Sequence, residues 1–519
     1  MKESRQSPVT GHQLPLSKSI LFSILSGILL SLPFCNGKLW LFAWFGFVPL
    51  FLAIQYKSRA RAFILSYLTG IVFWSIAIYW LINVTLLGQI LLILYLALYF
   101  GIFGITIPDC PAGRSSSSSI IRFIFIPCLW VTLEYLRSHM LTGFGWALLG
   151  YSQYLNLPVI QIADLFGAYG VSFLVMMMNV VVWKLIKGTS RAFFLSLFCL
   201  LSALSYGFLR LYPASALGRQ AASIKISVVQ GNIPQELKWA YGAETFILER
   251  YKKLTELASR DRPDLIIWPE ASSPGFLGEG KDDWISQAIF SLAKETNIPL
   301  LFGSAVRQKE EYFNSALLIG AQGKVSARYD KLHLVPFGEY IPLKKLFPFL
   351  ETIVPIGDFT AGKEYTLFEL SAFSHPRLSS RQAPSAKFAV LICFEDTIPE
   401  LSRGFVNKGA DFLVNITNDA WFGRSWAAYQ HLSASVFRAI ENRVPLARSA
   451  NTGVSCIIDT RGRITDTLYE NNKDIFISGI KTGTIILDKG RSLYSAVGDI
   501  FALGCLALAL AYGIIIKLR

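Results

Sequence analysis

The sequence predicts a membrane protein with two parts: a multi-pass α-helical domain and an α/β domain inserted before the last of eight spans. Three observations support this fold class. The 519 residues are 53% hydrophobic and only 16% charged, with a mean hydropathy of +0.44, which is too apolar for a soluble protein of this length. Long apolar runs fill the first 210 residues. After about residue 224, short β-rich runs alternate with polar stretches.

Eight apolar runs approach or exceed the roughly 20 residues that a helix needs to cross a bilayer. They are residues 16–35, 37–54, 62–82, 88–108, 121–136, 168–186, 192–210 and 497–516. The fifth run is short and carries Glu134 near its end. An intramembrane carboxylate is costly, so we expect Glu134 to face the bundle interior or to lie at the interface. The first run resembles a signal peptide, but Phe34 is too large for the small-residue cleavage rule, which favours an uncleaved span.

The basic residues are distributed unevenly between the two sides of these spans. With a cytoplasmic N-terminus, the short outer loops hold only Lys38 and Arg137, and the inner segments hold thirteen Lys and Arg. This positive-inside bias predicts that both termini are cytoplasmic. We therefore predict seven spans over residues 1–210, an outer domain over 211–496 and a C-terminal membrane helix over 497–519. The inner basic residues are Lys2, Arg5, Lys18, Lys57, Arg59, Arg61, Arg114, Arg122, Lys184, Lys187, Arg191, Lys517 and Arg519.

Seven short runs in the outer domain have the length and composition of buried strands, and their alternation with helix-like stretches predicts an α/β fold. They are "IKISVVQ", "LIIW", "PLLFGSA", "SALLIG", "FAVLIC", "FLVNI" and "VSCIID". The net charge of +14 does not indicate a nucleic-acid partner, because many of the basic residues lie between apolar runs. The seven cysteines form no CxxC pair and the five histidines are well separated, so we expect no metal site.

Ionisable side chains follow the predicted strands at three places, and the first two lie in the front half of the outer domain. In "DLIIWPEAS", Pro269 ends the apolar run and Glu270 follows it. In "ARYDKLHLVPFGEYIP", Lys331 and His333 are two residues apart, so in a strand they share one face, and a Pro and Gly turn then leads to Glu339. Catalytic groups favour the ends of strands, although each residue alone is also typical of a solvated loop or a satisfied core position.

The third place is "FAVLICFEDTIPE", where Cys393 and Glu395 follow an apolar run. Free cysteine is among the most buried residue types, so this stretch alone is more typical of a buried strand end. A thiol is mostly protonated at neutral pH, and a nucleophilic cysteine therefore needs a nearby base or cation. Glu270 and Lys331 provide one of each. The three stretches together favour Cys393 as a nucleophile.

Several motifs carry a resemblance to known proteins. "WPE" at 268–270, "DKLHLVPFGE" at 330–339 and "CFE" at 393–395 resemble the nitrilase (carbon-nitrogen hydrolase) superfamily, which uses a Glu, Lys, Cys triad. More narrowly, the chain resembles the apolipoprotein N-acyltransferase family over nearly its whole length. The motifs for this are "VVQGNIPQELKW", "NITNDAWFG", "ARSANTGVS" and "TGFGWALLGYSQ".

The resemblance implies a nitrilase-like α-β-β-α sandwich on the periplasmic side of a bacterial inner membrane. It implies acyl transfer from a membrane phospholipid to the α-amino group of the N-terminal S-diacylglyceryl cysteine of an apolipoprotein, which completes lipoprotein maturation. No cofactor, metal or nucleic acid is implied. Carried over by position, Cys393 is the nucleophile, Glu270 the general base and Lys331 the cation beside the oxyanion. The supporting active-site positions are Trp239, Glu339 and Glu395.

This layout makes chemical sense independently of the family. Glu270 takes the thiol proton, Cys393 attacks an ester carbonyl, and Lys331 stabilises the developing negative charge, which is worth roughly 3 to 4 kcal/mol per well-placed donor. The thioester left on Cys393 is then attacked by an amine. Two substrates used in turn predict ping-pong kinetics.

Some apolar residues are candidates for lipid or acyl-chain contact. The segment 341–356, "IPLKKLFPFLETIVPI", is unusually apolar for a loop, and Leu346 and Phe349 within it are expected to meet the membrane as a lid or lipid guide. Packing within the soluble core is an equal alternative. Trp421 and Phe422 are expected to line the acyl pocket or to pack in an aromatic core. Phe394 is a departure, because members of the family often carry Tyr there.

Two other functions remain open at this stage. A membrane-tethered amidase or nitrilase would use the same triad on a small amide, but one membrane anchor would suffice for it. A transporter or receptor would carry ionisable residues inside several spans, whereas here only Glu134 lies near the end of one.

Overall fold

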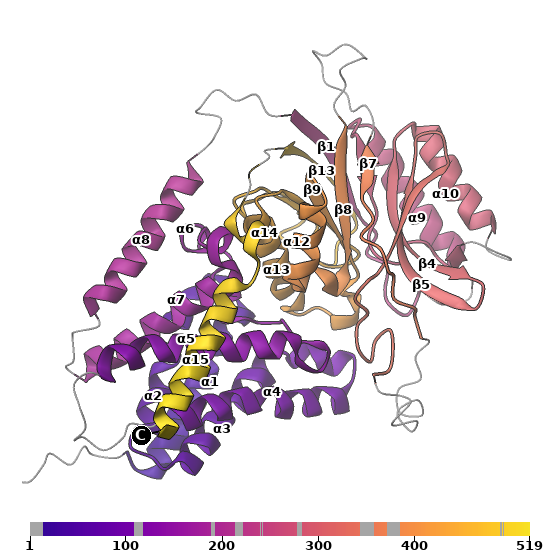
Figure 1. Ribbon diagram of the computed structural model, residues 1–519. Coiled ribbons are helices and arrows are strands. Elements are labelled where there is room, and N and C mark those ends of the chain that lie inside the picture. Colours follow the sequence, from indigo (N-terminus) through magenta and orange to yellow (C-terminus); the bar gives the residue numbers. More distant parts are fainter. Residues whose placement is uncertain are drawn as a thin grey trace, which may run out of the picture.

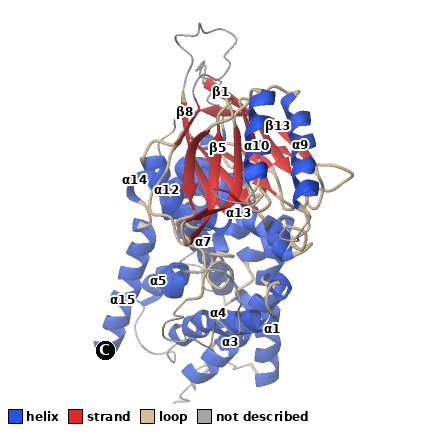
Figure 2. Ribbon diagram, turned by 90° about the vertical axis from the view of Figure 1, so that its right-hand side faces the viewer, coloured by secondary structure: helices blue, strands red, loops and turns tan. Residues whose placement is uncertain are grey.

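The protein folds into a helical half and an α/β half, which lie against each other in the computed structural model (Figure 1). Figure 2 shows the strands gathered in the α/β half, above the membrane-type helices. The structure describes residues 14–107, 118–187, 193–212, 222–238, 240, 242–277, 283–342, 358–370, 385–487, 490 and 492–518.

The helical half contains long apolar helices joined by short 3₁₀ turns. Six segments within the described ranges are long and apolar enough to cross a membrane, and they agree with six of the eight predicted spans. The predicted spans at 121–136 and 497–516 fall on α5 and α15, which are helical, but their crossing stays a prediction. The elements are α1 (Leu16–Cys35), η1 (Gly37–Trp44), α2 (Val48–Ile54), α3 (Arg59–Ala77), η2 (Tyr79–Asn83), α4 (Leu86–Thr106), α5 (Ser118–His139), η3 (Met140–Thr142), η4 (Leu149–Gln153), α6 (Leu157–Ile160), α7 (Ala163–Ile186), α8 (Phe193–Leu211), α14 (Leu493–Val497) and α15 (Ile500–Leu518).

The second predicted span is not one continuous helix. The chain leaves the 3₁₀ helix η1 at Phe45, whose φ of −139° and ψ of 3° are not helical, and re-enters a helix at Val48 with Pro49 in its first turn. Proline is tolerated at this position because the first-turn N–H groups have no partner within the helix. Gly46 at the break packs against Leu30 of α1, where a Cβ atom would lie 2.7 Å from a leucine methyl group. The sequence pattern gave the apolar length and missed this break.

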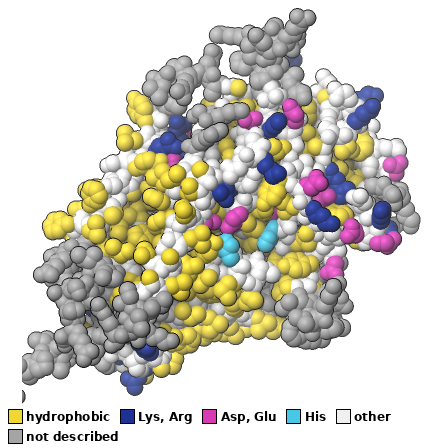
Figure 3. All heavy atoms as spheres, in the orientation of Figure 1, with side chains coloured by type: hydrophobic (Ala, Val, Ile, Leu, Met, Phe, Trp, Pro, Cys, Tyr) yellow, Lys and Arg dark blue, Asp and Glu magenta, His cyan; other side chains and the backbone are white. Residues whose placement is uncertain are grey.

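The outer surface of the helical half is apolar, as lipid contact requires. In α4, one face is buried in the bundle and the opposite face exposes large aliphatic side chains. Figure 3 shows hydrophobic side chains covering this half, whereas Lys, Arg, Asp and Glu gather over the α/β half. The exposed residues of α4 are Leu86, Leu87, Ile90, Leu91, Leu94, Leu98 and Ile102.

Two sheets form the centre of the α/β half. Within the described residues the first has strand order β13-β1-β2-β4-β5-β6, with β3 also paired to β4, and the second has the order β12-β11-β10-β9-β8-β7. All seven predicted strands are present. The strands are β1 (Ala222–Gln230), β2 (Leu265–Ile267), β3 (Phe276–Leu277), β4 (Leu300–Gln308), β5 (Glu311–Ile319), β6 (Val325–Asp330), β7 (Phe368–Leu370), β8 (Ala386–Ile392), β9 (Phe412–Thr417), β10 (Leu446–Ala450), β11 (Cys456–Ile458), β12 (Ile464–Thr467) and β13 (Gly479–Leu487).

The sheets stack face to face between two layers of helices, which agrees with the expected α-β-β-α sandwich (Figure 1). Successive side chains of β2 point to opposite sides: Leu265 and Ile267 enter the core between the sheets, and Ile266 enters the core under α9 (Glu244–Ser259) and α10 (Asp283–Thr296). The hydroxyl of Ser449 on β10 donates to the carbonyl of Ile267, and this bond links the two sheets. The other helical layer consists of α12 (Pro399–Asn407) and α13 (Ala427–Asn442).

Strand direction brings the ends of several strands to one edge of the sandwich. In the first sheet β2 is parallel to β4, and two antiparallel pairings then return β6 to the same direction. In the second sheet β8 and β9 are parallel. The residues that follow β2, β6, β8 and β9 therefore share an edge, and Glu270, Lys331, Cys393 and Asn418 are among them.

Candidate active site

Glu270 follows β2 and is held from three other segments. Its Oε1 accepts a hydrogen bond from Asn314 Nδ2 at 2.9 Å, and its Oε2 accepts one from the backbone N–H of Asn418 at 3.0 Å. Its own carbonyl accepts a bond from Lys238 Nζ at 2.9 Å. Gly303 of β4 makes room for this turn, because a Cβ there would lie 2.6 Å from the Cα of Glu270. The carboxylate is thus fixed in a buried position.

Lys331 lies directly after β6 and is almost fully buried, with 1% of its surface exposed. Its Nζ is 2.9 Å from Glu339 Oε1 and 3.6 Å from Glu270 Oε1. Burial opposes the charge on the ammonium group, but the two carboxylates outweigh it and raise the pKa of Lys331 above its usual value. The sequence pattern would place Lys331 and His333 on one face if both lay in a strand. They do not share a strand face, because β6 ends at Asp330.

Cys393 follows β8 and begins the short 3₁₀ helix η6 (Cys393–Thr397). It is half-buried, and its φ of 53° is left-handed, a conformation that non-glycine residues rarely adopt. Burial and the Glu270 carboxylate raise the pKa of the Cys393 thiol well above its usual value, while Lys331 acts in the opposite direction. The resting side chain is therefore the neutral thiol, and Glu270 and Lys331 both act electrostatically on it.

Glu395 connects the Cys393 turn to the Lys331 turn. Its Oε1 accepts hydrogen bonds from the Tyr329 hydroxyl at 2.8 Å, the Leu332 N–H at 2.7 Å and the His333 N–H at 3.1 Å. Its Oε2 accepts the N–H of Ile392, just before Cys393, at 2.8 Å. Burial raises the pKa of Glu395 to about 7, against the effect of these donors. Glu395 therefore holds two loops together, which is a positioning task.

The other predicted residues differ in their placement. Glu339 Oε1 accepts bonds from Lys331 Nζ and, at 2.7 Å, from Asn314 Nδ2, so it belongs to the same cluster. Trp239, Leu346 and Phe349 lie outside the described residues, as does most of the proposed lid over 341–356.

The aromatic candidates divide between the surface and the junction of the two halves. Trp421 is 49% exposed. Phe422 packs on Trp80 of the helical half, with ring centroids 4.4 Å apart. Phe394 stacks with the rings of Trp146 and His333, at centroid distances of 6.4 and 6.2 Å. Phe394 and Phe422 thus connect the sheet edge that carries Cys393 to the helical half.

Three site residues were not singled out from the sequence. Asn314 near the start of β5, Asn418 after β9 and Lys238 all contact Glu270. Burial lowers the pKa of Lys238 to about 8, although Glu270 raises it. Asn418 lies in the quoted motif "NITNDAWFG", which was a usable signal, whereas Asn314 sits in an ordinary strand pattern and gives none.

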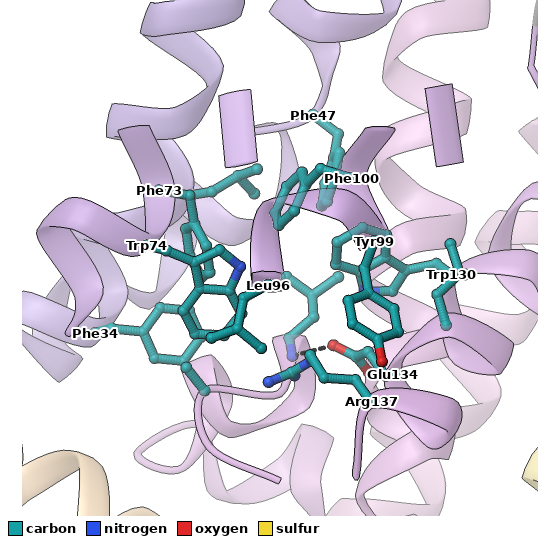
Figure 4. Close-up of a pocket in the computed structure, with 14 residues that line it drawn as sticks. Phe34, Phe47, Phe73, Trp74, Leu96, Tyr99, Phe100, Trp130, Glu134 and Arg137 are labelled. Carbon is teal, nitrogen blue, oxygen red and sulfur yellow. Dashed lines mark hydrogen bonds between the residues drawn. The ribbon is translucent and has the colours of Figure 1, made fainter. Parts of the chain in front are cut away.

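A small apolar cavity lies inside the helical bundle, below this edge. Aromatic rings surround it, and Glu134 and Arg137 stand at one end (Figure 4). Glu134 faces the interior, one of its two expected positions, and its Oε1 accepts the backbone N–H of Leu149 at 2.6 Å. Arg137 donates to the carbonyl of Trp146 at 2.7 Å, so the cavity wall is linked to the ring that stacks on Phe394.

Potential metal ligands also meet away from the triad. His139, Glu400 and Asp499 each bring one ligand atom within 4.8 Å of the others. Within the described residues, this is the one group of three such side chains that could hold a metal ion. His139 lies on α5 and Glu400 on α12, and Asp499 directly precedes α15. Among them, His139 Nε2 lies 2.7 Å from Glu400 Oε1.

Comparisons with known proteins give a consistent result. The family models for the apolipoprotein N-acyltransferase N-terminal domain and for carbon-nitrogen hydrolase match residues 26–181 and 225–489. A protein from Geobacter metallireducens named apolipoprotein N-acyltransferase is 38% identical, over 94% of this chain and 94% of its own. One of the same name from Shewanella oneidensis is 32% identical, over 79% and 76%. Among solved structures, an amidase from Nesterenkonia sp. matches with a TM-score of 0.38 and 17% identity, over 55% of this chain and 97% of its own.

Proposed function

This chain belongs to the apolipoprotein N-acyltransferase family, and we propose that it transfers an acyl chain from a membrane phospholipid to the α-amino group of the N-terminal S-diacylglyceryl cysteine of an apolipoprotein. The family names of its relatives and the carbon-nitrogen hydrolase domain support this activity. The acyl chain is carried as a thioester on Cys393, with Glu270 and Lys331 as its partners.

The first half-reaction forms the thioester. Because the Cys393 thiol is neutral at rest, its proton must leave as the sulfur attacks the ester carbonyl, and the Glu270 carboxylate takes that proton. The tetrahedral intermediate collapses as the C–O bond to the lysophospholipid breaks. The departing oxygen then receives the proton back from Glu270. Sulfur remains bonded to the acyl carbon.

The second half-reaction releases the acyl chain to the lipoprotein. The α-amine of the diacylated cysteine attacks the thioester carbonyl, and Glu270 accepts the proton that the amine loses. The C–S bond breaks, the Cys393 sulfur recovers a proton from Glu270, and an amide remains on the product. Both tetrahedral intermediates carry negative charge on oxygen. Lys331, buried and held positive by Glu339 and Glu270, is the group that stabilises it.

The observation that carries this proposal is the meeting of a neutral thiol, a fixed carboxylate and a buried ammonium at one sheet edge. The edge adjoins an apolar helical half through Phe394 and Phe422. Both substrates carry acyl chains anchored in a bilayer, so a membrane bundle beside the thiol suits them. We propose residence in the bacterial inner membrane, with cytoplasmic termini and a periplasmic domain over 211–496, between the bundle 1–210 and the last helix 497–519.

Mass spectrometry of the purified protein tests the proposal directly. After incubation with phospholipid, the peptide containing Cys393 is expected to gain the mass of one acyl chain, and a diacylated lipopeptide is expected to remove it as an N-acyl product. Glu270→Gln, which keeps the side-chain shape but not the base, should slow adduct formation by about 10² to 10⁴-fold. Transfer that persists in Cys393→Ser would disprove the nucleophile assignment. An adduct that only water removes would favour a hydrolase.

A further inference from the structure

Four charged side chains form a closed cluster beneath Cys393. His431 of α13 places Nε2 2.9 Å from Asp396 Oδ1 and Nδ1 2.9 Å from Asp419 Oδ1. Arg448 of β10 donates Nη1 to Asp396 Oδ2 at 3.0 Å and Nη2 to Asp419 Oδ2 at 3.2 Å. All four residues are buried. The cationic side chains of His431 and Arg448 thus alternate with the carboxylates of Asp396 and Asp419, so each buried charge lies beside charges of the opposite sign.

The geometry requires His431 to be an imidazolium. Its Nε2 hydrogen bonds to the carbonyl oxygen of Cys393 at 3.2 Å, and its Nδ1 bonds to Asp419 Oδ1 at 2.9 Å. Both oxygens only accept hydrogen bonds, so both ring nitrogens must carry a proton. Burial disfavours the charge, but Asp396 and Asp419 outweigh it and raise the pKa of His431 to about 9, against an opposing effect of Arg448.

The cluster acts on the backbone of the nucleophile. The Cys393 carbonyl accepts hydrogen bonds from Asn415 Nδ2 and from His431 Nε2, both at 3.2 Å. Asn415 is itself held by Arg448, whose Nη1 donates to its Oδ1 at 2.6 Å. Both donors therefore belong to the cluster or touch it. A left-handed non-glycine residue persists only where its surroundings fix it strongly, and these two bonds fix Cys393.

We propose that His431, held between Asp396 and Asp419, is a positioning residue that fixes the Cys393 turn so that the thiol meets Glu270 and Lys331. The inference rests on the proposed function in that it takes Cys393 as the nucleophile. The titratable and charged groups that face His431 are Asp396 from η6, Asp419 from η7 (Asp419–Phe422) and Arg448 from β10.

The first test compares His431→Gln with Leu432→Ala, a matched change of the next buried residue on α13 that bears no polar group. The rate of Cys393 alkylation by iodoacetamide is followed by peptide mass mapping in the full-length protein in micelles. We expect His431→Gln to slow alkylation at least tenfold at pH 8, and Leu432→Ala to stay within twofold of the wild type. A normal rate in folded His431→Gln, or equal slowing in both variants, would overturn the proposal.

Adduct formation with phospholipid gives a second readout. In His431→Gln the rate at saturating phospholipid should fall at least tenfold, while the half-saturating concentration stays within twofold, because the lipid contacts are untouched. A change in the half-saturating concentration alone would count against a positioning role. If wild-type protein is alkylated at Cys393 but never acylated, the proposed function fails while the positioning role is still decided by the alkylation rates.

Asp419→Asn supplies a test that does not need a His431 variant to fold. Asp419 raises the pKa of His431, so without this carboxylate the loss of acylation on the alkaline side should begin at a lower pH than in the wild type. The same change also lowers the pKa of the Cys393 thiol. That second effect changes the acid side of the pH profile of acylation, so the two effects can be told apart. An unchanged alkaline limb would show that the His431 charge does not matter.

Discussion

At the scale of single residues, Asn314 organises the charges around the triad. Its one amide group donates to Glu270 Oε1 at 2.9 Å and to Glu339 Oε1 at 2.7 Å, while Lys331 lies between the same two carboxylates. An amide donor neutralises no charge, so it separates the carboxylates without competing with Lys331 for them.

The first prediction therefore concerns Asn314→Ala. The change leaves both carboxylates one donor short and less firmly held, and we expect adduct formation on Cys393 to slow by about 10²-fold, in the range seen for misplaced catalytic groups. Mass spectrometry with phospholipid measures it. Gln308→Ala, an exposed change in the neighbouring strand β4, is the control and should be neutral. A rate within threefold of the wild type in Asn314→Ala would contradict this role.

The second prediction concerns Phe394, where the family often has Tyr. Its ring stacks with those of Trp146 and His333, and each such aromatic pair is worth about 0.5 to 1.5 kcal/mol. Phe394→Tyr keeps the ring and should leave acylation within about threefold, whereas Phe394→Ala should lower it about tenfold. Rates with phospholipid decide this. A tenfold gain in Phe394→Tyr would mean that the missing hydroxyl has a chemical task.

The third prediction concerns the pH dependence of stability through Lys238. Its folded-state pKa of about 8 lies below the ordinary value of 10.5, so folding disfavours its charged form. Stability should fall as pH drops from about 10.5 through 8 and stay level below that, by on the order of 3 kcal/mol relative to Lys238→Met. Thermal unfolding in micelles between pH 7 and 10.5 measures the difference. If the unfolding temperatures of the wild type and of Lys238→Met change with pH in parallel, the lowered pKa of Lys238 is refuted.

At the scale of elements, α13 joins the two halves of the molecule. Gln430 Nε2 donates to the carbonyls of Phe34 and Ala77, at 2.8 and 2.9 Å, in the last turns of α1 and α3. Its Oε1 accepts the indole N–H groups of Trp80 and Trp146, at 3.1 and 2.7 Å. The amide thus pairs carbonyls at two membrane-helix ends that have no partner within the helix. Its neighbour His431 contacts the Cys393 turn.

The fourth prediction concerns Gln430→Leu. The change leaves two buried carbonyls and two indole N–H groups without this partner, and each unsatisfied buried group costs about 1 to 3 kcal/mol. We expect the midpoint of thermal unfolding in micelles to fall by several degrees. Tyr429 lies on the same helix, and Tyr429→Phe, which loses only the hydrogen bond from its hydroxyl to Asp474, should have a small effect. Equal shifts in the two variants would argue against a special role for Gln430.

At the scale of the whole molecule, the helical and α/β halves share buried polar contacts. Asp164, in the first turn of α7, accepts bonds from Arg443 Nη2 and from Arg210 Nη2, both at 2.7 Å. An acidic residue at a helix N-terminus also complements the helix dipole. Together with Gln430, these contacts fix the triad edge against the bundle.

The fifth prediction concerns orientation in the membrane. Asn472 is exposed in the α/β half, and Ala60 is exposed at the start of α3. In intact spheroplasts, a membrane-impermeant maleimide should label Asn472→Cys at once and Ala60→Cys only after permeabilisation. Peptide mapping separates these sites from the natural cysteines. Labelling of Ala60→Cys in intact cells would reverse the predicted topology.

Much of the fold could be predicted because its signals are local. Apolar length predicted six of the eight expected spans correctly, and short β-rich runs predicted seven strands, all of which are present. Strands with mixed composition, such as β12 and β13, were missed because pairing with neighbours, rather than their own pattern, stabilises them. The bundle break at Gly46 depends on packing against Leu30, which no local pattern records.

By itself, the sequence determined the membrane class, the α/β domain and the three residues Glu270, Lys331 and Cys393 as candidates, because composition, periodicity and motif chemistry are local properties of the chain. Only the tertiary structure decided how these residues are held. Asn314, Gln430 and His431 act through contacts with residues far away in the sequence, and hydrogen bonds of that kind exist only after the strands and helices have packed.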